Sequence, residues 1–325
     1  MSAGWYVVRR LLWAVVVTYL ILSVTFAFIV LTPNAQVAEL QFQTAASGGD
    51  PGEAEQAFER ARGREGSLVR QYLTYMGNLL TLNWGWSDTR SQPVTEAILE
   101  AYPYSLMYAA PAVILSTVLG LAIGLYSATH RYTAGDYLAT LFAFFGLSIP
   151  NFWLGIVLLL VFGVVLGWVP VVFDPDVPAF SVRNAAQLAL PVLVLATSSV
   201  AGIMRYTRAE ALEYVRAEFV KMARAKGASE WRVLTRHVFR PALVPLVTIL
   251  VGDLLGIFLA FSLLVEVVFG IPGLGRLSYQ ALLNGDTALV LGTTLVPVFL
   301  AVVGNLLQDV AYSVLDPRIE LGGRE

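Results

Sequence analysis

The sequence predicts an all-α integral membrane protein with six transmembrane helices and with both chain termini in the cytoplasm. Hydrophobic residues make up 57% of the 325 positions and charged residues 14%, with a mean hydropathy of +0.69. This composition excludes an ordinary soluble globular domain. The charges are also segregated: in the six-span topology, 14 of the 21 Lys and Arg residues fall in cytoplasmic segments. Membrane proteins concentrate positive charge on that side, so the count supports the topology.

The first span is predicted at residues 11–31, which form an apolar run after Arg9 and Arg10. About 20 apolar residues are needed to cross a bilayer as a helix. A cleaved signal peptide usually has an apolar core of only about 7–15 residues. We therefore expect an uncleaved helix, and the paired arginines place the N-terminus in the cytoplasm.

Residues 32–103 are predicted to form an insertion of about 70 residues on the outer side of the membrane. Its first part, up to Gly52, is rich in small and polar residues and is typical of a loop. From Glu53 the pattern favours helix, with an apolar face formed by Val69, Leu73, Met76 and Leu80. Residues 83–87 (Asn-Trp-Gly-Trp-Ser) then mark the membrane–water boundary, where tryptophan is favoured. The insertion holds no convergent acid–base set, so we expect a cap on the membrane domain.

Five further spans are predicted at residues 104–128, 137–169, 187–204, 241–269 and 287–312. Three of them carry a GxxxG pair, which lets a neighbouring helix approach closely: Gly120 with Gly124, Gly163 with Gly167, and Gly252 with Gly256. Thr133 and Asp136 form a capping box before the third span. The third span is too long for one straight crossing and too short for two, so we expect one crossing bent near Pro150.

Ionisable side chains inside the spans are costly to place and should face protein or water. Asp253 lies deepest in its predicted span and either lines a substrate path or bonds to a neighbouring helix. Glu266 and Asp309 lie near helix ends, where a structural role or a salt bridge is expected.

A basic, amphipathic segment separates the fourth and fifth spans. Nine Arg or Lys side chains occur between Arg205 and Arg240. A helix is predicted whose apolar face contains Val215, Phe219, Met222 and Ala223. Gly227 interrupts it, and Ser229 caps a second helix with an apolar stripe of Trp231, Leu234 and Val238. The segment lies outside the membrane and offers apolar surface either to a groove on a partner protein or to acidic lipid.

Several kinds of catalytic motif are missing from the sequence. There is no phosphate-binding G-x-x-x-x-G-K-[ST] loop, no H-E-x-x-H zinc motif and no G-x-S-x-G nucleophile elbow. The chain has no cysteine, and its two histidines, His130 and His237, lie in separate polar connections. We therefore expect neither an enzyme nor a chain that binds a cofactor or metal.

Together these features resemble the permease subunit of binding-protein-dependent ABC importers of the dipeptide/oligopeptide/nickel class. The resemblance covers nearly the whole chain except residues 35–65. The motifs that carry it are Asn83-Trp-Gly-Trp-Ser87, Gly146-Leu-Ser-Ile-Pro150, Phe152-Trp153-Leu-Gly155, Ala223-Arg-Ala-Lys-Gly227-Ala-Ser, Glu266, Phe269, Pro272-Gly273-Leu-Gly275, Asp286, Asn305, Asp309 and Asp316-Pro317-Arg318. The basic segment corresponds to the family's EAA loop, a helix pair that docks on an ATPase. Aligned on Gly227, the EAA triplet falls at residues 221–223, where only Ala223 is kept.

The resemblance implies a division of the chain and a set of partners. The expected parts are residues 1–31 (N-terminus and first helix), 32–103 (outer insertion), 104–316 (transmembrane domain, with the coupling loop at 212–241) and 317–325 (cytoplasmic tail). The coupling residues would be Phe219, Met222, Ala223, Gly227, Ser229 and Trp231; Asp253, Glu266, Asn305 and Asp309 would be pathway or structural residues. The partners would be a homologous permease in a heterodimer, two ATPase subunits that hold ATP and Mg, an external solute-binding protein, and membrane lipid. Nucleic acid is not expected.

The implied function is ATP-driven import of dipeptides or oligopeptides across the plasma (inner) membrane. Nickel or another small solute is an alternative substrate within the same class. A secondary transporter driven by an ion gradient is an alternative from another class, although such folds often have paired broken helices and only one break is predicted here. An intramembrane enzyme and a non-transporting scaffold are the remaining alternatives.

Overall fold

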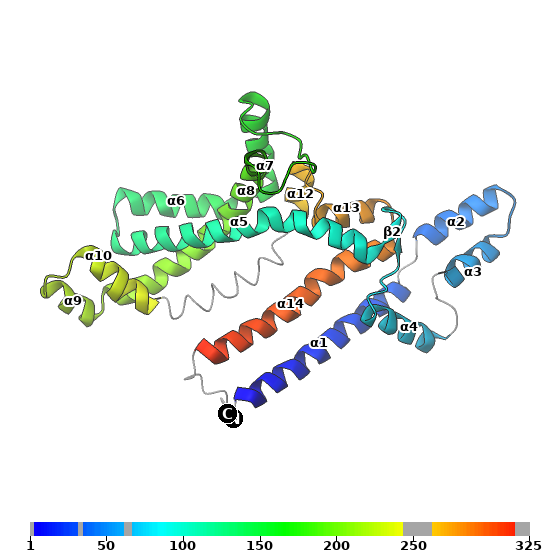
Figure 1. The fold of residues 1–325 in the computed structure, drawn as a ribbon, viewed down its shortest axis with the longest axis horizontal. Helices are drawn as coiled ribbons and strands as arrows, with labels where there is room; N and C mark the ends of the chain where they lie inside the picture. Colours follow the sequence, from blue (N-terminus) through cyan, green and yellow to red (C-terminus); the bar gives the residue numbers. More distant parts are fainter. Residues whose placement is uncertain (1–2, 32–34, 62–66, 243–261, 316–325) are drawn as a thin grey trace. The chain divides into compact units, whose positions relative to one another are not determined.

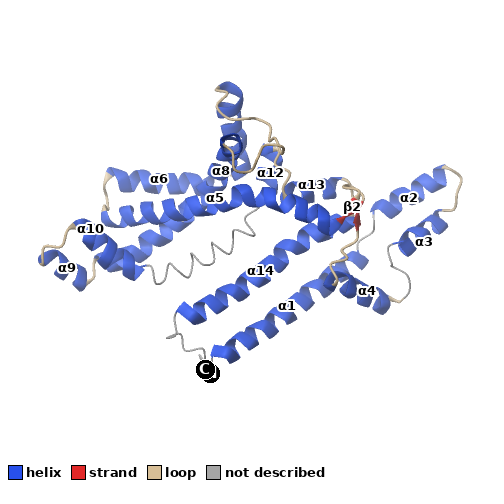
Figure 2. Cartoon of the chain, in the orientation of Figure 1, coloured by secondary structure: helices blue, strands red, loops and turns tan. Residues whose placement is uncertain are grey.

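A computed structural model describes residues 3–31, 35–61, 67–242 and 262–315. Helix makes up most of these residues, and the strands form one short hairpin (Figure 2). The chain divides into two compact units (Figure 1). The first holds the described parts of residues 1–103 and 274–309, and the second those of 104–273 and 310–316.

The first unit begins with the long helix α1 (Ala3–Leu31). The insertion follows as three short helices, α2 (Ala35–Ala46), α3 (Pro51–Ala61) and α4 (Leu68–Leu80), and an antiparallel hairpin of β1 (Trp86–Ser87) with β2 (Gln92–Pro93). The start of α5 (Val94–Thr129), α13 (Leu274–Leu283) and most of α14 (Thr287–Leu315) complete the unit.

The second unit contains the rest of α5 and a series of helices that follow it. These are α6 (Ala134–Ser148), α7 (Asn151–Leu158), the π-helix η1 (Leu159–Val165), α8 (Val182–Val215), α9 (Glu218–Ala225), α10 (Glu230–Arg232), the π-helix η2 (Val233–Phe239) and α12 (Leu263–Phe269). Helix α8 is the centre of this unit, because α6, α7, η2 and α12 all contact it.

Four described helices are long and apolar enough to cross a membrane: Val8–Leu31, Val94–Thr129, Val182–Val215 and Thr287–Gln308. A fifth candidate is the bent pair Ala134–Ser148 with Asn151–Val165, whose axes differ by 103°. The predicted bend near Pro150 is therefore confirmed. The predicted span at 241–269 lies mostly in residues 243–261, outside the described part of the chain, and so do Asp253 and the third GxxxG pair.

Close packing of α5 on α8 explains the first GxxxG pair. A Cβ built on Gly120 would lie 2.6 Å from the Ile203 Cβ, and one on Gly124 would lie 2.6 Å from the Met204 carbonyl oxygen. Only glycine lets the two backbones come this near. The second pair does not act in this way, because Gly167 follows the end of its helix and a Cβ there would meet nothing within 4 Å.

Several helix limits differ from the sequence prediction. The first part of the insertion, predicted to be a loop, contains helix α2 (Ala35–Ala46), and α8 (Val182–Val215) extends beyond both ends of the span predicted at 187–204. Helix α5 begins at Val94 instead of residue 104, because residues 94, 97, 98 and 101 form a buried stripe with helical spacing. The hydropathy pattern predicted only the more apolar part of this longer helix. The helix predicted through residues 215–223 is divided, since α8 ends at Val215 and α9 begins after Ala217.

Candidate functional site

The basic segment folds as a helical elbow, residues 217–240, at the C-terminal end of α8. Helix α9 ends at Ala225, and Gly227 has a φ of +78°, in the left-handed region that glycine adopts without strain. The amide of Gly227 donates to the Arg224 carbonyl at 2.9 Å, and that of Ala228 donates to the Ala223 carbonyl at 3.1 Å. This pair of bonds is a Schellman motif. The predicted glycine break is confirmed, and it fixes the angle between the two arms.

The second arm starts with the predicted cap. The Ser229 hydroxyl accepts a bond from the Arg232 amide at 3.4 Å. Across the turn, the Arg224 guanidinium donates to both carboxylate oxygens of Glu230 at 3.1 Å. Both side chains are exposed, so this pair adds little stability. Its bidentate geometry nevertheless joins the last turn of α9 to the first turn of α10.

A small apolar core holds the elbow against the ends of α5 and α8. Val220 of α9 and Val233 and Val238 of the second arm are buried with Ala128 and Ala211. The predicted apolar faces are therefore wrong in part. Val220 is the buried residue of α9 because the break at residues 216–217 turns this helix relative to α8.

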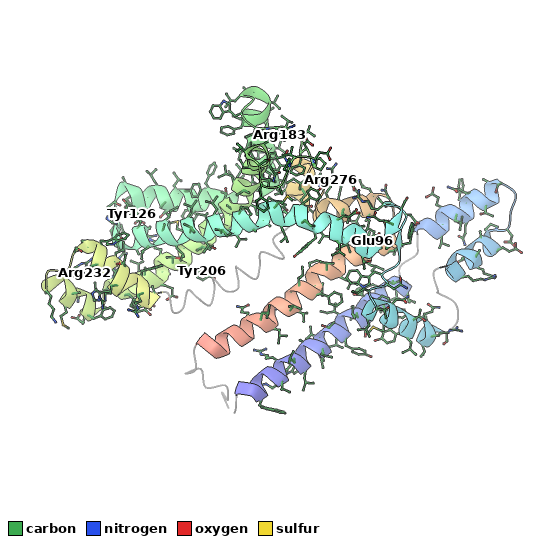
Figure 3. All side chains as sticks on the ribbon, viewed as in Figure 1. Glu96, Tyr126, Arg183, Tyr206, Arg232 and Arg276 are labelled. Carbon is green, nitrogen blue, oxygen red and sulfur yellow. The ribbon has the colours of Figure 1, made fainter. Side chains whose placement is uncertain are left out.

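The residues that the core does not use form an exposed apolar surface, called here the elbow surface. Trp231 is 73% exposed, Met222 54% and Phe219 43%; Ala223 is half-buried. Exposed basic side chains lie around them on the same two arms: Lys221, Arg224, Lys226, Arg232 and Arg236. Figure 3 shows side chains projecting from this end of the second unit, where Arg232 is labelled.

A second polar feature is the buried carboxyl group of Glu266, which is 0% exposed. It accepts hydrogen bonds from the Ser105 hydroxyl at 2.7 Å and the Tyr108 hydroxyl at 3.0 Å, both on α5. The Tyr108 oxygen in turn accepts from the Ser262 amide at 2.8 Å. A Cβ on Gly273 would lie 2.5 Å from this carboxyl group. The cluster joins α12 and the turn that follows it to α5.

Asp286 has a comparable place in the first unit. Its side chain is buried and accepts bonds from the Ser87 hydroxyl at 2.7 Å, the Thr89 amide at 3.1 Å and the Leu289 amide at 3.0 Å. One carboxylate thus caps α14 and ties it to the end of the outer insertion. Only the family resemblance singled out this residue.

Asp136 joins three segments, a role that sequence reasoning missed. The predicted capping bond is present, because the Asp136 amide donates to the Thr133 hydroxyl at 3.3 Å. Its buried carboxylate also accepts from the Ser127 hydroxyl, from the Tyr132 amide at 3.0 Å and from Arg208 of α8 at 2.9 Å. Asp136 is an acidic residue at a helix start, and Arg208 is far from it in the sequence. No local sequence pattern therefore predicted the contact between them.

Two further predicted positions lie on α14. Asn305 is exposed on α14, and Asp309 lies near the end of the same helix. Within the described ranges, no group of three or more His, Cys, Asp or Glu side chains could hold a metal ion.

The fold defines an α-helical, multi-pass integral membrane protein. Comparison with known proteins is more specific: residues 120–321 match the family model described as the binding-protein-dependent transport system inner membrane component. The chain belongs to this family. The resemblance seen in the sequence is confirmed, and the protein is a transport permease of the inner membrane.

Several curated relatives cover most of the chain. The oligopeptide transport system permease protein AppB of Bacillus subtilis is 38% identical over 77% of this chain and 80% of its own length. A putative peptide transport system permease protein of Brucella suis is 34% identical over 96% and 98%. The oligopeptide transport system permease protein OppB of Haemophilus influenzae is 34% identical over 78% and 80%.

Proposed function

We propose that this chain is one permease subunit of an ATP-driven importer of dipeptides or oligopeptides. The family supports a permease that works with a binding protein, and the relatives named as oligopeptide permeases support the substrate class. The chain itself binds no cofactor in this proposal. ATP and Mg are held by two separate ATPase subunits, and the pathway is completed by a homologous permease.

The proposed topology has six spans with both termini inside, including a crossing at residues 241–269. The proposed parts are the first span (1–31), the outer insertion (32–103), the transmembrane domain (104–316) with its coupling loop (212–241), and the tail (317–325). In this topology the elbow is cytoplasmic, and the insertion faces the binding protein.

The observation that carries the coupling role is the elbow surface. Three large apolar side chains stay exposed although Val220, Val233 and Val238 of the same two arms are buried in an apolar core. Exposed apolar side chains on a rigid helix pair suit a groove on a partner protein. The Schellman turn at Gly227 and the buried Val220 fix the arms to α8, so a push on the surface is transmitted to that span as a rigid-body movement.

A charge placed on the elbow surface tests this role. Met222→Asp should prevent co-purification of the ATPase subunits and abolish ATP-driven peptide uptake in proteoliposomes, because the carboxylate would be desolvated in the partner's groove. Met222 is 54% exposed, so the isolated chain should still fold. The control is Val172→Asp, which places the same charge at a 76% exposed position in the connection before α8.

The turn itself provides a second test. A Cβ built on Gly227 meets nothing within 4 Å, but Gly227→Leu forces a residue with a side chain to adopt a φ of +78°, at a cost of about 1–3 kcal/mol. We expect the ATPase subunits to bind, but less tightly than to the wild type, and we expect peptide uptake to fall. Uptake and ATPase binding that both match the wild type in the two elbow variants would contradict the coupling role.

A further inference from the structure

Helix α4 of the outer insertion has an apolar face that the described chain leaves open. Val69 is 69% exposed, Leu73 64% and Leu80 79%, at i, i+4 and i+11 on one side of the helix. No residue of α4 is buried. A separate face of the same helix is polar and contains Arg70, Thr74 and Asn78. A helix with two such faces and an uncovered apolar side needs an apolar surrounding on that side.

The side of α4 next to the apolar face is held against α1. The Ser23 hydroxyl donates to the Tyr19 carbonyl at 2.8 Å, so the Tyr72 hydroxyl donates the 2.6 Å bond that joins it to Ser23. The ring of Phe26 lies 5.3 Å from the ring of Tyr72 and 5.4 Å from that of Tyr75, centroid to centroid.

These contacts set the depth of α4 relative to the bilayer. Ser23 and Phe26 belong to the candidate span Val8–Leu31. They lie eight and five residues before its end at Leu31, about 12 and 7.5 Å at the helical rise of 1.5 Å per residue. The tyrosines of α4 therefore lie below the end of an apolar span.

The C-terminal end of α4 also lies beside another candidate span. The Trp84 indole donates to the carbonyl of Leu79 in the last turn of α4 at 3.3 Å. Its ring lies 6.1 Å from that of Phe299, which belongs to the candidate span Thr287–Gln308. Both ends of α4 are thus fixed beside membrane-spanning helices at positions inside their apolar runs. Tyrosine and tryptophan are the residues favoured at such a boundary.

We propose that α4 lies in the lipid bilayer interface as an amphipathic anchor, with Val69, Leu73 and Leu80 inserted among acyl chains and Arg70, Thr74 and Asn78 facing the headgroups and water. Interfacial helices bury their apolar face about 5–10 Å into this region; the depth of about 7.5 Å at Phe26 lies within this range, and that of about 12 Å at Ser23 lies slightly beyond it. The anchor holds the end of the insertion at the membrane surface. The leaflet is the outer one in the topology proposed above, but the insertion into lipid does not depend on that topology.

Spin labels can distinguish lipid from water and from protein at these positions. The chain contains no cysteine, so Leu73→Cys and Thr74→Cys each give a single labelling site, one on the apolar face and one on the polar face, at neighbouring residues. The full chain, assembled with its partner subunits in phospholipid nanodiscs, is measured for collision of the label with oxygen, which enters lipid, and with a water-soluble nickel chelate. We expect the ratio of oxygen to nickel collisions to be severalfold higher at position 73 than at position 74.

Two results would overturn the proposal. A label at position 73 that collides with nickel as readily as the label at 74 would place the apolar face in water. A label shielded from both reagents would place this face against a protein partner instead of lipid. Val69→Cys repeats the measurement on the same face, so a failure of one variant to assemble does not remove the test.

Discussion

Removing the hydroxyl of Tyr108 should loosen α12 and the turn that follows it. Tyr108→Phe deletes the bond to Glu266 (3.0 Å) and leaves the Ser262 amide without the acceptor that it reaches at 2.8 Å. Tyr108 and Glu266 are both 0% exposed, so water does not replace the lost partners. A net hydrogen bond contributes about 0.5–1.5 kcal/mol and an unsatisfied buried group costs about 1–3 kcal/mol. We therefore expect local opening to become easier by about 1.5–4.5 kcal/mol.

Amide hydrogen exchange of the assembled complex measures this change directly. A free-energy change of about 2 kcal/mol makes exchange about 27-fold faster, since about 1.4 kcal/mol corresponds to a factor of ten. The affected amides should be those of residues 263–273. Tyr104→Phe is the matched control, because Tyr104 lies one turn earlier on α5 and its hydroxyl makes no hydrogen bond to a described residue. An exchange rate in Tyr108→Phe within about threefold of the control rate corresponds to a free-energy change below about 0.7 kcal/mol, and this result would refute the reasoning.

Three further substitutions test other contacts of the structure. Gly273→Ala should lower the thermal midpoint of the assembled complex, because the added Cβ would lie 2.5 Å from a buried carboxyl group and overpacking costs about 1–3 kcal/mol. The control is Gly202→Ala, where a Cβ meets nothing within 4 Å; this variant should leave the thermal midpoint unchanged or raise it. Asp136→Asn should reduce the yield of folded chain in detergent, since a hydrogen bond to a charged group contributes about 1.5–3 kcal/mol, and a wild-type yield would contradict the role of its buried ion pair. Ser87→Ala should increase protease cleavage of the insertion, because it removes the 2.7 Å bond to Asp286, and cleavage at the wild-type rate would show that this bond does not hold the hairpin.

The sequence predicts features that depend on short-range physics. The bend near Pro150, the glycine turn at Gly227 and the caps at Thr133 and Ser229 were all predicted and are all present. Each follows from the preferences of one or two residues for a backbone conformation. The apolar runs likewise locate the four candidate spans and the bent pair of the described residues, because crossing a bilayer requires a certain length of apolar helix.

Contacts between distant segments were beyond the reach of sequence patterns. A period of 3.6 residues predicts that the elbow has an apolar face, but it does not tell which apolar residues are buried and which stay exposed. Val220 is buried because α9 packs on the ends of α5 and α8 through this residue, whereas Met222 of the same helix is exposed. The sequence pattern correctly placed Leu73 on an apolar face of α4. It did not predict the contact of α4 with α1, which depends on the hydrogen bond between Ser23 and Tyr72, 49 residues apart.

The three buried carboxylates, which lie within or at the ends of the spans, can select one helix partner in a way that apolar packing in a membrane protein cannot. Lipid tails are as apolar as leucine, so burying leucine against a neighbouring helix does not by itself select one helix partner or register. Asp136, Glu266 and Asp286 each accept bonds from two or more groups, and the donors lie up to 199 residues away in the sequence. A carboxylate that loses these donors is left desolvated, which penalises any slipped arrangement more than the loss of one apolar contact would. We infer that these residues specify how the segments of each unit pair. Besides the lower yield predicted above, Asp136→Asn should alter crosslinking between α6 and α8 in the chain that does fold, and wild-type crosslinking in that chain would refute this role.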